Sequence, residues 1–232
     1  MNFKINYHSH TRYSDGCDTI KTMALKAKEL GFCCHVITDH FYGRGDSWAS
    51  LTRKTYLKSV EEAKAVSDKI EFPIFVGIEA GFERAEEINI FGSYAIDFFF
   101  SKEGGSYGTY ETYKHMRENH DCACILNHPS LHKFFEKNGL DIIDGFEACN
   151  SGGYFFKERE EELQRLLDAG KHAFSNSDAH GDVSLDRGYN VIDSSVSTEA
   201  ELIRSIRKGP TLLYTAHKGI FEIGDRNGII PG

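Results

Sequence analysis

Residues 3–16 read Phe-Lys-Ile-Asn-Tyr-His-Ser-His-Thr-Arg-Tyr-Ser-Asp-Gly, an apolar segment that leads directly into polar side chains. Residues 3–7 are predicted to form a β-strand, because apolar and polar residues alternate along them. His8 and His10 follow immediately, and Asp15 comes shortly afterwards. A His-x-His pair suits a metal ion but also occurs by chance. The segment alone therefore indicates a strand that ends in a candidate metal site.

Short apolar segments and helical segments alternate along the rest of the chain. We expect helices near residues 19–30, 56–67, 110–118, 131–137, 157–169 and 198–208. We expect further strands at residues 35–38, 73–78, 95–100, 122–126, 144–148, 172–175 and 189–192. This alternation predicts a parallel sheet, either open or closed into a barrel. The 232 residues contain no evident repeat or linker, so we predict a single domain over residues 1–232.

The composition excludes several classes of protein. With 40% hydrophobic residues, 27% charged residues and four prolines, the chain is neither disordered nor collagen-like. A net charge of −8 disfavours a long nucleic-acid partner. No apolar stretch is long enough to span a membrane, and the N-terminus lacks the apolar core of a secretory signal. The six cysteines form no Cys-x-x-Cys pair, so we predict buried free thiols and a cytoplasmic location.

Residues of metal-binding type follow nearly every predicted strand. After the first strand these positions are Asp39–His40, Glu79, Ser101–Glu103, Asn127–His128, Asn150 and Asp178–His180. The C-terminal ends of the strands of a parallel barrel share one rim, where residues distant in sequence can meet. Any one of these residues could be structural, but their recurrence at strand ends favours a site for Zn, Mn or Fe.

The order and spacing of these motifs resemble those of the PHP family (polymerase and histidinol phosphatase domain). The matching segments are residues 8–16, 38–40, 79, 127–129 and 177–180. The resemblance extends from residue 5 to about residue 190. It implies a distorted (β/α)7 TIM-like barrel with two or three divalent metal ions at the C-terminal rim of its strands.

The resemblance also implies three adjoining metal sites. The first would be formed by His8, His10, Glu79 and Asp178, and Glu79 would bridge to His128 in the second. The third would be formed by Asp15, His40 and His180. Asp39 is expected to orient His40 rather than to bind an ion itself.

One expected ligand is missing from the second site. Relatives usually supply a further histidine at one of two places, which here carry Asn89 and Glu103. We predict that Glu103 replaces the imidazole with a carboxylate, which would favour a harder ion such as Mn. The alternative is a second site that is weak or empty.

A cluster of two or three metal ions suits phosphate ester hydrolysis by a metal-bound water, with no protein nucleophile. We therefore predict a metal-dependent phosphatase for a small phosphomonoester, with histidinol phosphate as one candidate. Arg12, Arg44 and Arg187 either bind the phosphate or are ordinary surface residues.

Two alternative functions stay open. One is a nucleotide phosphatase or nuclease of the same fold, which the short interval of 49 residues between Glu79 and His128 disfavours. The other is a metal-binding PHP module with reduced or no catalysis. The sequence leaves the oligomeric state open.

Overall fold

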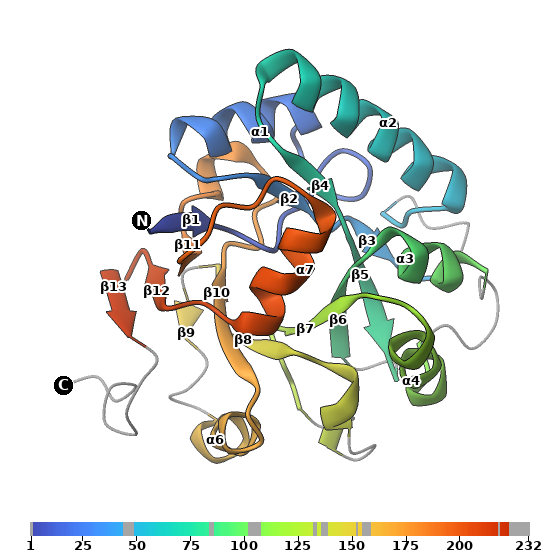
Figure 1. Cartoon of the computed structure of the whole chain (residues 1–232), viewed down its shortest axis with the longest axis vertical. Coiled ribbons are helices and arrows are strands. Elements are labelled where there is room, and N and C mark those ends of the chain that lie inside the picture. The colour runs from blue at the N-terminus through green and yellow to red at the C-terminus, as the bar shows by residue number, and fades with distance from the viewer. Residues whose placement is uncertain are drawn as a thin grey trace.

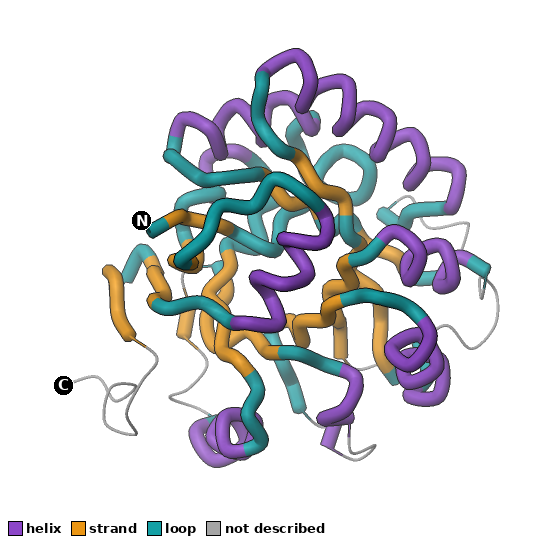
Figure 2. Tube along the Cα trace, viewed as in Figure 1, coloured by secondary structure: helices purple, strands orange, loops and turns teal. Residues whose placement is uncertain are grey.

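The computed structural model has a mixed α/β architecture (Figure 1). It describes residues 2–43, 49–83, 86–101, 108–131, 134–135, 139–151, 153–154, 159–217 and 219–222. Most of the strands lie in the interior with helices around them, whereas β12 (Leu212–Thr215) and β13 (Gly219–Glu222) lie at one edge (Figure 2). The strands are hydrogen-bonded into three sheets of seven, four and two strands.

The largest sheet carries most of the predicted site residues. Its strands are β3 (His40–Phe41), β5 (Ile78–Phe82), β6 (Glu86–Phe91), β7 (Ala123–Asn127), β8 (Gly145–Asn150), β9 (Gly153–Tyr154) and β10 (His172–Asn176). They run in the order β10-β8-β7-β6-β5-β3, with β9 paired to β8. β6 is antiparallel to both of its neighbours, whereas β3–β5, β7–β8 and β8–β10 are parallel pairs.

The four-stranded sheet holds both the first and the last described strand, and the two-stranded sheet is formed by β2 (His35–Ile37) and β4 (Ile74–Val76). The antiparallel sheet contains β1 (Phe3–Ile5), β11 (Gly188–Ile192), β12 (Leu212–Thr215) and β13 (Gly219–Glu222). β2 pairs in parallel with β4. After β1, His10 N donates to Ala179 O and Thr38 N donates to Ser9 O, each at 2.8 Å. The first motif therefore lies between the ends of β2 and β10.

The structure confirms the α/β class but not the closed (β/α)7 barrel. Within the described residues the strands form three separate sheets instead of one closed ring. The parallel pattern is broken by β6 and by the antiparallel pair β1–β11. The predicted strand at 73–78 is divided between β4 and β5, which belong to different sheets.

The predicted strand at 95–100 is wrong, because these residues belong to helix α3 (Ser93–Phe100). The buried residues Ala95, Ile96, Phe99 and Phe100 follow the spacing of one helix face. The aromatic run favours a strand by composition, but helical packing prevails. The sequence prediction also missed β3, β6, β9, β12 and β13. Of these, β6 contributes Ile88 and Ile90 to the main core cluster.

Five of the predicted helices are confirmed. They are α1 (Ile20–Glu29), α2 (Arg53–Ile70), α4 (Tyr110–Asn119), α6 (Glu160–Asp168) and α7 (Glu199–Lys208). Thr19 caps α1, because its side chain accepts a hydrogen bond from Thr22 N. Two short 3-10 helices, Gly139–Ile142 and Asp182–Ser184, complete the described set. Most of the helix predicted at 131–137 lies outside the described residues.

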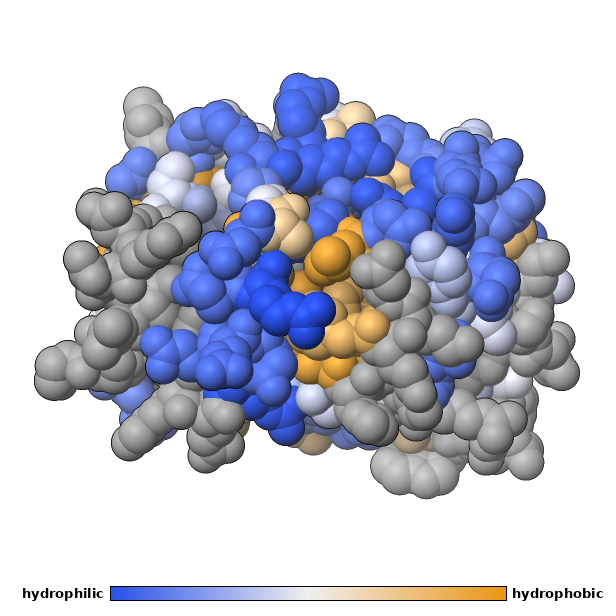
Figure 3. All heavy atoms as spheres, turned by 90° about the horizontal axis from the view of Figure 1, so that it is seen from below, coloured by the Kyte–Doolittle hydropathy of each residue, from blue (hydrophilic) through white to orange (hydrophobic). Residues whose placement is uncertain are grey.

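Aromatic side chains fill much of the main core. Its fully buried members include Phe41, Phe82, Phe99, Tyr113, Phe134 and Phe146. The six cysteines are free, and four of them are buried, while Cys17 is exposed. On the face shown in Figure 3, hydrophilic residues border a small apolar area. No helix in the described part of the chain is long and apolar enough to cross a membrane.

A partly buried ion pair joins α4 to the segment before β8. Arg117 donates from both terminal nitrogens to Asp144, each at 2.8 Å, and Cys124 N also donates to Asp144. We expect Asp144→Ala to lower the free energy of unfolding by about 3–5 kcal/mol, because Arg117 loses its partner. Asp97→Ala removes the exposed Arg53–Asp97 pair and should cost less than about 1 kcal/mol. Urea unfolding of both variants measures these changes, and an equal loss of unfolding free energy in the two variants would contradict the prediction.

Candidate metal centre

The loop after β1 carries Asp15 back towards His10. Ser14 N and Gly16 N both donate to Thr11 O, at 3.1 and 3.0 Å, which closes the loop tightly. A Cβ atom on residue 16 would lie 2.7 Å from the backbone of His10, so only glycine fits there. This local geometry brings a carboxylate and an imidazole of the first motif together.

Asp39 holds this loop in place. Its carboxylate accepts hydrogen bonds from Thr11 N and Thr11 Oγ1, each at 2.7 Å, and from Ser14 Oγ at 2.6 Å. Asp39 is fully buried. It was expected to orient His40, but its hydrogen bonds position the loop that carries Asp15.

Glu79 lies at the centre of the cluster, and its side chain is fully buried. Its Oε2 atom is 3.3 Å from both His8 Nε2 and His10 Nε2, and 2.9 Å from His40 Nδ1. Its Oε1 atom is 3.1 Å from His128 Nε2. One carboxylate thus contacts imidazoles from all three predicted metal sites, as a bridging ligand requires.

Asp178 completes the first predicted site. Its Oδ1 atom lies 3.3 Å from His8 Nε2 and 3.1 Å from His10 Nε2. Asp178 has a φ of 48°, and His128 has a φ of 21°. Backbone conformations of this kind are costly for residues other than glycine and occur preferentially at functional sites.

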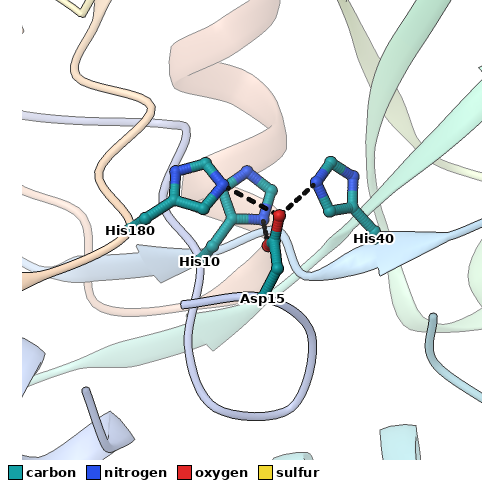
Figure 4. A group of neighbouring side chains, drawn as sticks. All are labelled: His10, Asp15, His40 and His180. Atoms are coloured by element: carbon teal, nitrogen blue, oxygen red, sulfur yellow. Dashed lines mark hydrogen bonds and ion pairs between the residues drawn. The ribbon is translucent and has the colours of Figure 1, made fainter. Parts of the chain in front are cut away.

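The third predicted group also comes together, and His10 joins it (Figure 4). The carboxylate of Asp15 points towards three imidazoles (Figure 4). Its Oδ2 atom is 3.2 Å from His180 Nε2 and 3.5 Å from His40 Nε2, and its Oδ1 atom is 3.8 Å from His10 Nδ1. All eight predicted ligands that the structure describes therefore lie in one continuous cluster.

The donor set fits divalent metal ions. His10 Nδ1 is buried without a hydrogen-bond partner among the described residues. His40 Nδ1 and Glu79 Oε2 lie 2.9 Å apart, but they are not aligned as a hydrogen bond and make no other one among the described residues. In the same part of the chain, no lysine or arginine nitrogen lies within 4 Å of the carboxylates of Asp15, Glu79 or Asp178. Buried carboxylates need a compensating positive charge. Imidazoles and carboxylates together suit Zn, Mn or Fe.

The carboxylates change the pKa values of the histidines around them. Burial lowers the pKa of His8, but Glu79, Asp178 and Glu147 together raise it well above its ordinary value. Burial likewise opposes protonation of His40, yet Asp15 and Glu79 raise its pKa to about 10. Without another cation, protons on imidazoles balance the carboxylates.

The sequence prediction missed Glu147, which lies on β8 and is fully buried. Its carboxylate accepts from His8 Nδ1 and His128 N, each at 2.8 Å. Asn150 and Asn176 donate to the same carboxylate. A bond from Nδ1 leaves His8 Nε2 available to an ion. The sequence feature that could have identified Glu147 is a single acidic residue within an otherwise apolar strand.

A second missed residue is Glu87 on β6, whose carboxylate joins His40 and Glu79 in one group of ligand atoms. Burial and the neighbouring Glu79 raise the pKa of Glu87. Nothing in the sequence motifs singles this residue out. Only the pairing of β6 with β5 and β7 brings it to the cluster.

The predicted phosphate-binding arginines are not part of the described cluster. Arg12 is exposed, its Nε donates to Cys17 O at 2.7 Å, and it lines a small pocket with Tyr13 and Glu62. Arg187 is also exposed. Arg44 and the predicted ligand Glu103 lie outside the described residues.

Glu147→Gln should weaken metal binding, because the amide keeps the size of the side chain but removes the charge that orients His8. We expect a loss of about 10–100-fold in affinity for the first ion. Calorimetric titration of the metal-free protein with Mn²⁺ measures this affinity. Unchanged affinity would show that His8 does not depend on Glu147.

The raised histidine pKa values predict a pH dependence for protein stripped of metal. The pKa of His40 is about 10 and that of His128 is about 9, against an unfolded value of about 6.5. Their stabilising contribution is complete below pH of about 6.5 and is lost as the pH rises through about 9–10. Urea unfolding of EDTA-treated protein should therefore show stability falling from about pH 7 to about pH 9.5. Constant or rising stability would contradict it.

Comparison with solved structures finds the same fold at low sequence identity. A two-domain protein from Bacteroides vulgatus, containing a predicted PHP-like metal-dependent phosphoesterase, matches with a TM-score of 0.62 and 17% identity. The match covers 93% of this chain and 65% of that protein, so this chain spans about two thirds of its length.

Two further structures match over most of this chain. The lesion-specific endonuclease PfuEndoQ from Pyrococcus furiosus has a TM-score of 0.60 and 14% identity, covering 93% of this chain and 59% of that one. PsfC from Pseudomonas syringae has a TM-score of 0.56 and 12% identity, covering 89% of each chain. These identities establish likeness of fold alone.

Sequence comparison supplies the family. No curated protein matches the chain. The family model described as PHP domain matches residues 6–185, which include all eight clustered ligands. This match spans well over half of the 232 residues. The chain therefore belongs to the PHP domain family.

Proposed function

We propose that this protein is a metal-dependent phosphatase that hydrolyses a small phosphomonoester. The observation that carries the proposal is the convergence of four imidazoles on the buried carboxylate of Glu79. Membership of the PHP family, whose members are metal-dependent hydrolases, supports the same chemistry.

Three groups of residues would hold the ions. His8, His10, Glu79 and Asp178 would hold the first, Glu79 and His128 the second, and Asp15, His40, His180 and His10 the third. Bound divalent ions lower the pKa of water and neutralise the phosphoryl and leaving oxygens of a phosphate ester.

The chain's own residues keep this donor set in position. Glu147 fixes the proton of His8 on Nδ1, and Asp39 fixes the loop that presents Asp15. Tyr42 stacks on the imidazole of His40, with ring centroids 4.9 Å apart, and so restricts its rotation. Such preorganisation favours catalysis because little rearrangement is needed when substrate arrives.

A small substrate accords better with the charge of the chain than a long nucleic acid does. The net charge is −8, and the exposed Arg12 already donates to a backbone carbonyl. Nucleic-acid affinity depends largely on many cationic contacts to phosphates. Endonuclease activity, known for one structural neighbour, is therefore the second candidate and an outcome of the test.

The test is phosphate release by Mn-reconstituted protein from a panel of phosphomonoesters. The panel contains histidinol phosphate, sugar phosphates and mononucleotides, and the same protein is assayed on labelled oligonucleotides. A preferred phosphomonoester would support the proposal and identify the substrate class. Cleavage of oligonucleotides alone would favour a nuclease, and inactivity with metal bound would favour a non-catalytic module.

Asp178→Asn should lower phosphate release by more than about 100-fold, because it removes a charged ligand rather than a supporting partner. The amide has the same shape, so unfolding by urea should change little. A rate of phosphate release within about tenfold of that of the unaltered protein would show that Asp178 is not a metal ligand. Asp193→Asn, at an exposed carboxylate that pairs with Lys208, is the matched control.

A further inference from the structure

The second predicted metal site lacks one ligand, and β6 places a carboxylate beside it. In the sheet, Glu87 lies opposite Gly81 on β5 and opposite Asn127 on β7. Asn127 immediately precedes His128 in the chain. The register therefore brings Glu87 next to the imidazole that the second ion requires.

The distances agree with this placement. Glu87 Oε2 is 3.4 Å from His128 Nε2, and Glu87 Oε1 is 3.9 Å from His40 Nδ1. Ligand atoms of Glu87, Glu79 and His40 all lie within 4.8 Å of one another. A single ion could therefore contact Glu87 together with the bridging carboxylate.

Asn89 stands at one of the two positions that the sequence resemblance suggests for the missing ligand, and it makes a different contact. It lies opposite Glu79 in the β5–β6 pair and is fully buried. Its amide donates a long hydrogen bond, at 3.4 Å, to the carbonyl oxygen of Tyr7. Because Asn89 and Glu87 are two residues apart on one strand, they share a face of the sheet.

The charges around Glu87 call for a cation. Its side chain is only 27% exposed, and it lies beside the carboxylate of Glu79. Within the described residues its only ionic contacts are to His40 and His128, with no lysine or arginine within 4 Å. Two carboxylates in one partly buried site repel each other unless a cation lies between them.

We propose that Glu87 is a ligand of the second metal ion, together with Glu79 and His128. This inference rests on the proposed metal-dependent function. With Glu87 in place of the missing histidine, the second site has two carboxylates and one imidazole. Oxygen-rich sites favour harder ions, so Mn²⁺ should bind there in preference to Zn²⁺.

The test counts metal ions in variants at position 87, independently of activity. Stripped protein is reconstituted with Mn²⁺, freed of loosely bound metal and analysed by mass spectrometry. Glu87→Gln should bind one ion fewer per chain, or bind its weakest ion at least about 10–100-fold less tightly. The exposed residue Glu118, changed to Gln, is the matched control and should keep the full count.

A second substitution separates ligation from charge. Glu87→His offers an imidazole in place of the carboxylate, so it should restore the ion count and shift the preference towards Zn²⁺. An unchanged preference for Mn²⁺ over Zn²⁺ in Glu87→His would mean that the side chain at position 87 does not contact the ion, which would overturn its assignment as a ligand.

Metal content tests the assignment of Glu87 as a ligand, and activity tests the proposed phosphatase function. A full ion count and unchanged affinity in Glu87→Gln would overturn the assignment of Glu87 while the proposed phosphatase could still stand. If the unaltered protein hydrolyses no phosphomonoester but Glu87→Gln still binds one ion fewer, the assignment of Glu87 is supported and the proposed phosphatase function is wrong.

Discussion

The carboxylate of Glu79 is fully buried in the middle of the molecule, where four imidazoles contact it. An ionised group in such a position is stable only when cations or strong hydrogen bonds compensate for lost hydration. Asp15, Asp178 and Glu147 add further carboxylates to the same cluster. Protonated histidines or metal ions must therefore supply the positive charge, and the surrounding structure is arranged to hold them.

Strand register delivers these groups to one place. Glu79 on β5 lies opposite His40 on β3 and opposite Asn89 on β6. A shift of one residue would turn Glu79 towards the face where Ile78 and Ala80 are buried in the main hydrophobic core. That core therefore specifies the register, and the register positions the candidate metal ligands. The stability of the fold and the geometry of the site are consequences of the same pairing.

The sequence predicted which side chains cluster better than it predicted the strands. His8, Glu79 and Asp178 stand out because each ends or interrupts an apolar segment, and a metal-type residue is conspicuous there. By contrast, Glu87 and Glu147 reach the cluster only through the pairing of distant strands, which local periodicity does not encode. The same limitation applies to the predicted parallel strand order, since the antiparallel direction of β6 is a property of tertiary pairing.

The charge of the cluster bears on how many ions the proposed phosphatase would hold. Asp15, Glu79, Glu87, Asp178 and Glu147 carry about five negative charges when ionised. Two divalent ions would leave a net charge of about −1, whereas three would leave about +1. A phosphomonoester near neutral pH carries a charge of about −2. In the proposed phosphatase three ions would therefore attract the substrate and two would repel it, and a count of bound ions per chain distinguishes the two cases.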